Sequence, residues 1–83
     1  MGSLPVVNGK DLVNYLCRNG YYVKRIHGSH HFCVHKDGTG TPLDVPVHSN
    51  NRIAKGTLSF IITVFARNEC VTEDEAKEMF RRL

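Results

Sequence analysis

The chain has 83 residues, enough for one modest hydrophobic core, and we expect residues 1–83 to form a single domain. Eleven Lys and Arg against eight Asp and Glu give a net charge of +3, which favours a polyanionic or acidic partner without identifying it. No apolar run is long enough to span a membrane and the first residues lack signal-peptide features, so we expect a cytoplasmic protein with no membrane partner.

The first predicted element is a helix of about three turns between Asn8, a typical N-cap, and Asn19-Gly20, a typical helix end. Its apolar residues recur at helical spacing: Leu12, Val13, Leu16 and Cys17. Residues 21–26 are aromatic and β-branched and predict a strand. A turn at residues 27–29 leads out of it.

Residues 30–35 predict a second strand, whose side chains alternate between two faces. One face carries His30, Phe32 and Val34, and the other carries His31, Cys33 and His35. We expect the face with Phe32 and Val34 to point into the core. Residues 43–48 alternate in the same way and predict a third strand, and Pro46 favours a position at a sheet edge or a break in pairing.

A second helix is predicted by an apolar stripe at i, i+3, i+4 and i+7: Leu58, Ile61, Ile62 and Phe65. Residues 72–83 predict a short C-terminal helical addition that begins with a capping box at Thr72 and Glu75. Either its acidic first turn folds back on the basic part of the chain as a weak brake, or its apolar side joins the core. We favour the core, because apolar residues again recur at helical spacing: Ala76, Met79, Phe80 and Leu83.

The three cysteines are odd in number and far apart: Cys17, Cys33 and Cys70. This spacing argues against a disulfide framework and a zinc knuckle, and we expect reduced thiols in or near the core. The element order predicts an α+β fold, α-β-β-β-α with a short extra helix. Its helices would pack on one face of a three-stranded antiparallel sheet, as in the double-stranded RNA-binding domain.

Five short motifs, in chain order, resemble the HicA toxin family of small mRNA interferases from toxin–antitoxin modules. They are Asn8-Gly9-Lys10, Gly20-Tyr21, Gly28-Ser29-His30-His31-Phe32, Val45-Pro46-Val47-His48 and Lys55-Gly56-Thr57-Leu58. The resemblance covers Val7 to about Phe65, and the segment after Ala66 departs from it. It implies that His30, directly after Gly-Ser, is catalytic, and that a HicB-like antitoxin covers this region.

RNA can be cleaved without a metal ion, because its own 2′-OH attacks the adjacent phosphorus when proton acceptors, proton donors and positive charge are in place. Histidine suits the proton steps near neutral pH. Gly28 lets the backbone approach a phosphate, and the Gly28 and Ser29 amides are candidates for binding an anion. From strand position alone a half-buried core histidine is the commoner role of a residue such as His30. The resemblance favours catalysis.

His31 is the second candidate for the catalytic histidine, because we expect its face of the strand to be the wetter one. A solvated strand histidine without a role is nevertheless the commoner case for His31 and for His35, and it is what we expect of His27 in the turn. His48 either lines the RNA site or only ends its strand, and the second proton-transfer group stays unassigned. We expect no metal site and no cofactor, since no Asp or Glu accompanies the histidines at ligand spacing.

Five of the eight acids lie in the last fifteen residues, so the chain from Lys10 to Lys55 is distinctly basic. The predicted RNA-binding residues in it are Lys24, Arg25, Lys36, Arg52 and Lys55. Each is a phosphate contact or simply a solvated charge.

We therefore expect a metal-independent mRNA endoribonuclease, the toxin of a toxin–antitoxin system, with RNA and a HicB-like antitoxin as partners and a monomeric state in isolation. Two alternatives belong to other classes. One is a non-catalytic double-stranded RNA-binding module in which His30 only shapes the loop. The other is a domain that binds only proteins.

Overall fold

The structure is a computed structural model that describes residues 3–49 and 51–83. Its elements follow the predicted order: α1 (Gly9–Arg18), β1 (Tyr21–His27), β2 (His30–His35), β3 (Leu43–Pro46), α2 (Lys55–Glu69) and α3 (Glu73–Arg81). The predicted α+β class, with three strands between helices and one extra helix, is confirmed. None of the helices in the described residues is long and apolar enough to cross a lipid bilayer.

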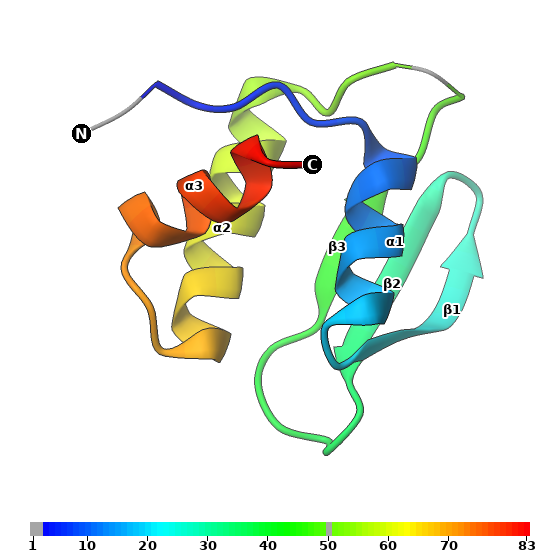
Figure 1. The fold of residues 1–83 in the computed structure, drawn as a ribbon. Helices are drawn as coiled ribbons and strands as arrows, with labels where there is room; N and C mark the ends of the chain where they lie inside the picture. Colours follow the sequence, from blue (N-terminus) through cyan, green and yellow to red (C-terminus); the bar gives the residue numbers. More distant parts are fainter. Residues whose placement is uncertain (1–2, 50) are drawn as a thin grey trace.

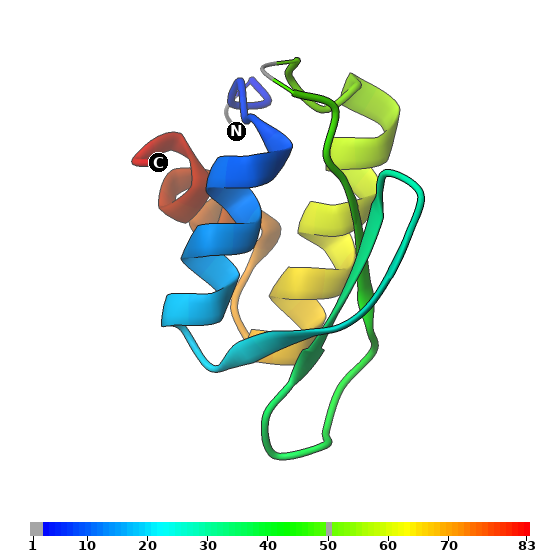
Figure 2. The same ribbon diagram turned by 90° about the vertical axis from the view of Figure 1, so that its right-hand side faces the viewer.

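The three strands form one antiparallel sheet in the order β1-β2-β3, so β3 is an edge strand as Pro46 predicted. Helices α1 and α2 both contact the sheet, and α3 packs against α2 (Figure 1). Both views place α1 and α2 on the same side of the sheet, and no described element covers the other side (Figures 1 and 2). The sheet therefore has one face in the core and one face open to solvent.

Helices α1 and α3 begin where their capping residues predict. The Asn8 side chain accepts a hydrogen bond from the backbone N–H of Lys10 at 2.9 Å. Thr72 and Glu75 form a reciprocal capping box with distances of 3.0 and 2.8 Å. These bonds satisfy backbone donors that a helix start leaves without partners.

The sheet and all three helices contribute residues to the core. These include Leu12 and Leu16 from α1, Tyr21, Cys33, Leu43 and Val45 from the sheet, Leu58, Ile61, Ile62 and Phe65 from α2, and Ala76 and Phe80 from α3. The Phe80 ring lies 5.0 Å from the Phe65 ring, centroid to centroid. Of the predicted α3 stripe, Met79 is partly buried and Leu83 stays exposed. In the α3 first turn Glu73 accepts a hydrogen bond from Thr63 of α2. These contacts favour the core role of α3 over the brake.

The prediction that Phe32 and Val34 face the core is wrong. Cys33 is fully buried, whereas Phe32 and Val34 are half-buried on the open face. A reduced cysteine packs as a small apolar residue, and the strand register aligns Cys33 with Val23 and Leu43 under the helices. His30 consequently lies on the open face, and His31 lies on the side of the helices.

A β-bulge at Lys24 changes which side chains of β1 reach the open face. Val23 pairs with Cys33, but Arg25, two residues later, pairs with the neighbouring residue Phe32. The extra residue shifts the alternation by one position. Because of this shift, Arg25 shares the open face with Phe32 and His30.

Close backbone packing joins the start of α1 to the end of β3. A Cβ atom added to Gly9 would lie 2.1 Å from the carbonyl oxygen of Pro46, so only glycine fits there. The ladder ends at Pro46 rather than at the predicted residue 48, although the N–H of Val47 still donates to the carbonyl of Ser29 at 2.8 Å. Both contacts fix the position of the chain next to His30.

All three cysteines are free thiols, but Cys17 and Cys70 are exposed. The expectation that the cysteines lie in or near the core is therefore correct only for Cys33. Cys17 follows the buried Leu16 on α1, and Cys70 ends α2 in a left-handed conformation.

Candidate functional site

The open face of the sheet carries a paired histidine and aspartate. Nδ1 of His30 lies 2.9 Å from Oδ1 and 3.1 Å from Oδ2 of Asp44. A carboxylate only accepts hydrogen bonds, so Nδ1 of His30 carries the proton and donates it. In the neutral imidazole the other ring nitrogen, Nε2, is then the acceptor, and the side chain is 52 % exposed. His30 is thus oriented by Asp44 and still accessible to a ligand.

The strand register explains why these two residues meet. His30 pairs with Pro46, and Phe32 pairs with Asp44, so His30 and Asp44 are diagonal neighbours on one face. Asp44 was not among the predicted site residues, and it lies fourteen positions from His30 in the chain. Because residues 43–48 alternate, Asp44 falls on the same face of the third strand as Pro46 and His48, and this was the available signal.

Arg25 and Phe32 continue the row on the other side of His30. The guanidinium carbon of Arg25 lies 4.6 Å from the centre of the Phe32 ring. The Phe32 and His30 rings are stacked at 6.4 Å between centroids with an interplanar angle of 28°. A guanidinium over an aromatic ring is attracted to the face of the ring and can still donate its N–H groups to a phosphate. Positive charge is therefore fixed close to the imidazole.

The turn before His30 is tight and anchored. Gly28 has a positive φ of 62° at the first position of a two-residue turn that joins the paired residues His27 and His30. Glycine is favoured at this position of a type II′ hairpin. The Ser29 carbonyl accepts hydrogen bonds from Val47 and from Nδ1 of His31. Gly28 and Ser29 therefore form the anchored turn that leads directly into His30.

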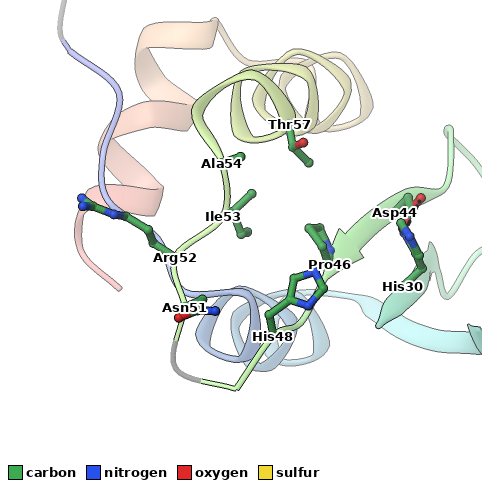
Figure 3. A pocket seen from close by; sticks show the side chains of 9 residues that line it. All are labelled: His30, Asp44, Pro46, His48, Asn51, Arg52, Ile53, Ala54 and Thr57. Atoms are coloured by element: carbon green, nitrogen blue, oxygen red, sulfur yellow. Dashed lines mark hydrogen bonds and ion pairs between the residues drawn. The ribbon is translucent and has the colours of Figure 1, made fainter. Parts of the chain in front are cut away.

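A pocket of about 490 Å³ opens beside His30 and Asp44 at the free edge of β3 (Figure 3). Its wall on the far side comes from the chain between β3 and α2 and from the first turn of α2. The remaining lining residues are Pro46, His48, Asn51, Arg52, Ile53, Ala54 and Thr57. His48 and His30 thus border the same pocket. This arrangement is what a role of His48 in lining the RNA site requires.

The other histidines do not join this pocket. His31 is half-buried on the side of the helices, and its ring is bound to the Ser29 carbonyl at 3.2 Å, so its expected wet environment is wrong. His35 lies at the far end of β2 against the Tyr21 ring and is also half-buried. His27 is exposed in the hairpin beside His30. Of the histidines in β2, only His30 offers a free ring nitrogen to the open face.

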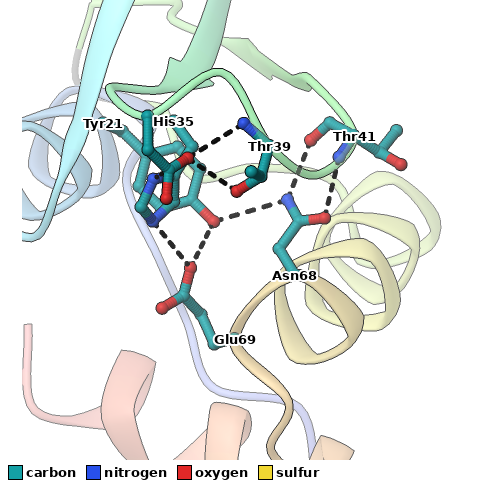
Figure 4. A network of polar contacts seen from close by, with 7 residues as sticks. Tyr21, His35, Thr39, Thr41, Asn68 and Glu69 are labelled. Atoms are coloured by element: carbon teal, nitrogen blue, oxygen red, sulfur yellow. Dashed lines mark hydrogen bonds and ion pairs between the residues drawn. The ribbon is translucent and has the colours of Figure 1, made fainter.

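His35 belongs to a polar network that ties the sheet to the end of α2 (Figure 4). The Tyr21 hydroxyl donates to Glu69 at 2.7 Å, and Nε2 of His35 lies 3.6 Å from the same carboxylate oxygen. Burial raises the pKa of the Tyr21 phenol far above its ordinary value, so it stays a neutral donor. Asn68 adds two hydrogen bonds with the Thr41 backbone. This network supports the fold rather than the pocket.

The predicted basic residues separate into groups. Arg25 lies on the open face, and the bulge residue Lys24 is exposed beside it, lining a small hollow with Phe32. Lys36 follows the end of β2, about 20 Å from His30 at 3.3 Å per residue. Arg52 extends away from His30 and His48 in Figure 3, and Lys55 shares a second hollow with it. The structure therefore does not gather all five around His30.

Within residues 3–49 and 51–83, no three His, Cys, Asp or Glu side chains lie close enough together to hold a metal ion.

Comparison with protein families gives one match. Residues 9–65, more than half of the chain, match the family model described as HicA toxin of bacterial toxin-antitoxin. No curated protein and no solved structure matches the chain. The family match ends within α2, so α3 lies outside it.

Proposed function

Because the chain belongs to the HicA toxin family, and so is the toxin of a toxin–antitoxin system, we propose that it is a metal-independent endoribonuclease that cleaves mRNA at His30. The observation that carries this proposal is the exposed His30 ring, oriented by Asp44 at the mouth of a pocket that His48 shares. An oriented histidine with an accessible Nε2 can accept or donate a proton, as general acid–base catalysis requires. The mRNA substrate would make the cytoplasm its place of action.

In the proposed reaction, Nε2 of His30 takes the proton from the ribose 2′-OH. The 2′-oxygen then forms a bond to phosphorus while the bond from phosphorus to the 5′-oxygen breaks. The leaving 5′-oxygen receives a proton, and the products are a 2′,3′-cyclic phosphate and a 5′-OH. Asp44 keeps the proton on Nδ1, so it fixes the reactive tautomer and the ring orientation.

Two further residues have roles in this proposal. His48 borders the same pocket as His30 and is our candidate for the group that protonates the leaving oxygen. Arg25, held on the Phe32 ring, faces the charge that develops on the phosphate. Lys24 is exposed next to it and would contact the neighbouring phosphate of the strand.

We also propose that the antitoxin is a HicB-like protein that covers the segment from Gly28 to Phe32. A toxin that cleaves mRNA must be held inactive, and burial of His30 would do so directly. The basic surface around Arg25 predicts an acidic patch on the antitoxin and an association that weakens with salt.

The experiment is cleavage of a defined RNA by the purified chain in excess EDTA, with analysis of the product ends. We expect cleavage that EDTA does not inhibit, with 2′,3′-cyclic phosphate and 5′-OH ends. Binding of double-stranded RNA without cleavage would support the non-catalytic module instead. Inhibition by EDTA that added zinc reverses would establish a metal site.

A further inference from the structure

We propose that the pocket beside His30 holds one unpaired base of the RNA, that of the nucleotide whose 2′-OH reacts, and that Asn51 selects this base. The inference rests on the proposed ribonuclease activity. It adds a substrate class, single-stranded RNA, and a residue that determines specificity. Asn51 is not among the site residues that the sequence predicted.

The first step is the position of the pocket. His30 and Asp44 form one side of it, and the chain between β3 and α2 forms the other (Figure 3). For Nε2 of His30 to take the 2′-OH proton, the two atoms must come within about 3 Å. The base on the same ribose is then held close to the mouth of this pocket. A volume of about 490 Å³ lies within the range of pockets that hold small molecules.

The second step is the chemistry of the lining. Pro46, Ile53 and Ala54 give an apolar wall on which a flat base can pack. The polar lining beyond His30 and Asp44 includes Asn51 and Thr57, and neither side chain makes a hydrogen bond to any other residue in the described part of the chain. Free donors and acceptors beside an apolar wall are what recognition of a base edge requires.

The third step separates single strands from duplexes. A base inside a double helix is stacked and paired, so its edge and face are not available to a pocket. Recognition of RNA sequence therefore uses unpaired bases. If the pocket takes a base, the duplex has to open first, and a paired substrate reacts more slowly.

Asn51 is the residue best suited to choose between bases. Its carboxamide carries both a donor and an acceptor, and its backbone is held by a hydrogen bond from its N–H to the His48 carbonyl at 2.8 Å. Asparagine pairs in this way with adenine, whereas a carboxylate only accepts, for example from the amino group of cytosine. A change from Asn to Asp keeps the shape and removes the donor.

The test cleaves single-stranded RNA of random sequence and identifies the base on the 5′ side of each cut. The same sequences are cleaved in parallel as duplexes. We expect the single strands to be cut at least about tenfold faster, with one base enriched on the order of tenfold. Asn51→Asp should change which base is enriched, and Thr57→Val should weaken the enrichment. The matched control is Asn14→Asp, the same change on the exposed side of α1, which should leave the preference as it is.

Affinity of His30→Ala for short single-stranded oligonucleotides of each base gives a second readout that needs no cleavage. The inference is overturned if Asn51→Asp keeps the base preference in both readouts, or if single strands and duplexes are cut equally fast. Absence of any cleavage by the wild type would refute the proposed activity alone. The base preference in binding would still decide the role of the pocket.

Discussion

Nδ1 of His30 donates a hydrogen bond to the Asp44 carboxylate across the β2–β3 pairing, with 2.9 Å between Nδ1 and Oδ1. Both side chains are about half exposed, so the pair is not part of the core. An exposed ion pair adds little stability. Its geometric effect is large, because it leaves Nε2 of the imidazole as the atom available to substrate.

Asp44→Asn should therefore reduce RNA cleavage on the order of a hundredfold or more, because an amide no longer holds the proton on Nδ1. The free energy of unfolding should change by less than about 1 kcal/mol. Steady-state kcat/KM and thermal melting measure the two effects. Asp11→Asn, which removes one charge from an exposed position on α1, is the control for net charge. Equal losses in both variants would reduce Asp44 to a general electrostatic role.

Arg25 and Lys36 should differ in their effect on RNA binding, although both are exposed cations. Arg25→Gln removes the charge held on Phe32 beside His30, and it should lower the slope of log affinity against log salt by up to about one unit. Lys36→Gln, at the other end of β2, should change the slope less. Binding titrations over a range of salt concentrations make the comparison. A larger change for Lys36 would move the RNA away from the His30 end of the sheet.

Gly9→Ala should destabilise the fold, because the new Cβ would overlap the Pro46 carbonyl. Overpacking of this kind costs about 1–3 kcal/mol. Gly56→Ala is the matched control, since a Cβ at Gly56 meets nothing within 4 Å and alanine favours the helix by up to about 1 kcal/mol. Urea unfolding of both variants measures the difference. A Gly9→Ala protein as stable as the wild type would show that α1 and β3 are not locked together there.

Stability should fall at alkaline pH because of Cys33. Burial, with smaller effects from Cys17 and Asp44, raises the pKa of its thiol from 9.0 to about 12. Below pH 9 the thiol is protonated in both states and its contribution to stability is complete. Above pH 9 the unfolded chain loses this proton while the folded chain keeps it, so stability declines by up to about 1.4 kcal/mol per pH unit.

The measurement is urea unfolding at pH 7, 9 and 10. Tyr21, whose ordinary pKa is 10.0, begins to add a similar loss of stability at pH 10 in both the wild type and a Cys33→Ser variant. Cys33→Ser keeps the size of the side chain close to that of cysteine and removes the titrating group. The variant should show a smaller loss of stability between pH 9 and pH 10 than the wild type. Identical pH profiles would mean that the thiol is accessible in the folded chain.

The order of the helices, both ends of α1 and the start of α3 could be predicted because local chemistry determines them. Asn8 and Thr72 cap helices with their own side chains, and apolar residues at helical spacing mark the buried sides of α2 and most of α3. Leu83 fails the pattern because it lies beyond the end of α3, where the chain is exposed.

The faces of the sheet could not be predicted in the same way, because they depend on pairing between strands. Phe32 and Val34 looked more apolar than Cys33, yet helix packing buries the cysteine face. The residue types along β1 do not reveal the bulge at Lys24. This bulge pairs Arg25 with Phe32. The partner of His30, Asp44, follows from the register of β2 and β3 rather than from any local motif.

The most direct measurement compares RNA cleavage by the wild type, His30→Ala and His31→Ala in EDTA, with a thermal melt of each protein. We expect His30→Ala to lose at least about a hundredfold in rate while its stability stays within about 1 kcal/mol, since His30 is exposed. His31→Ala should keep most of the activity, because its ring lies on the side of the helices. Full activity in His30→Ala, or a loss confined to His31→Ala, would contradict the role of His30.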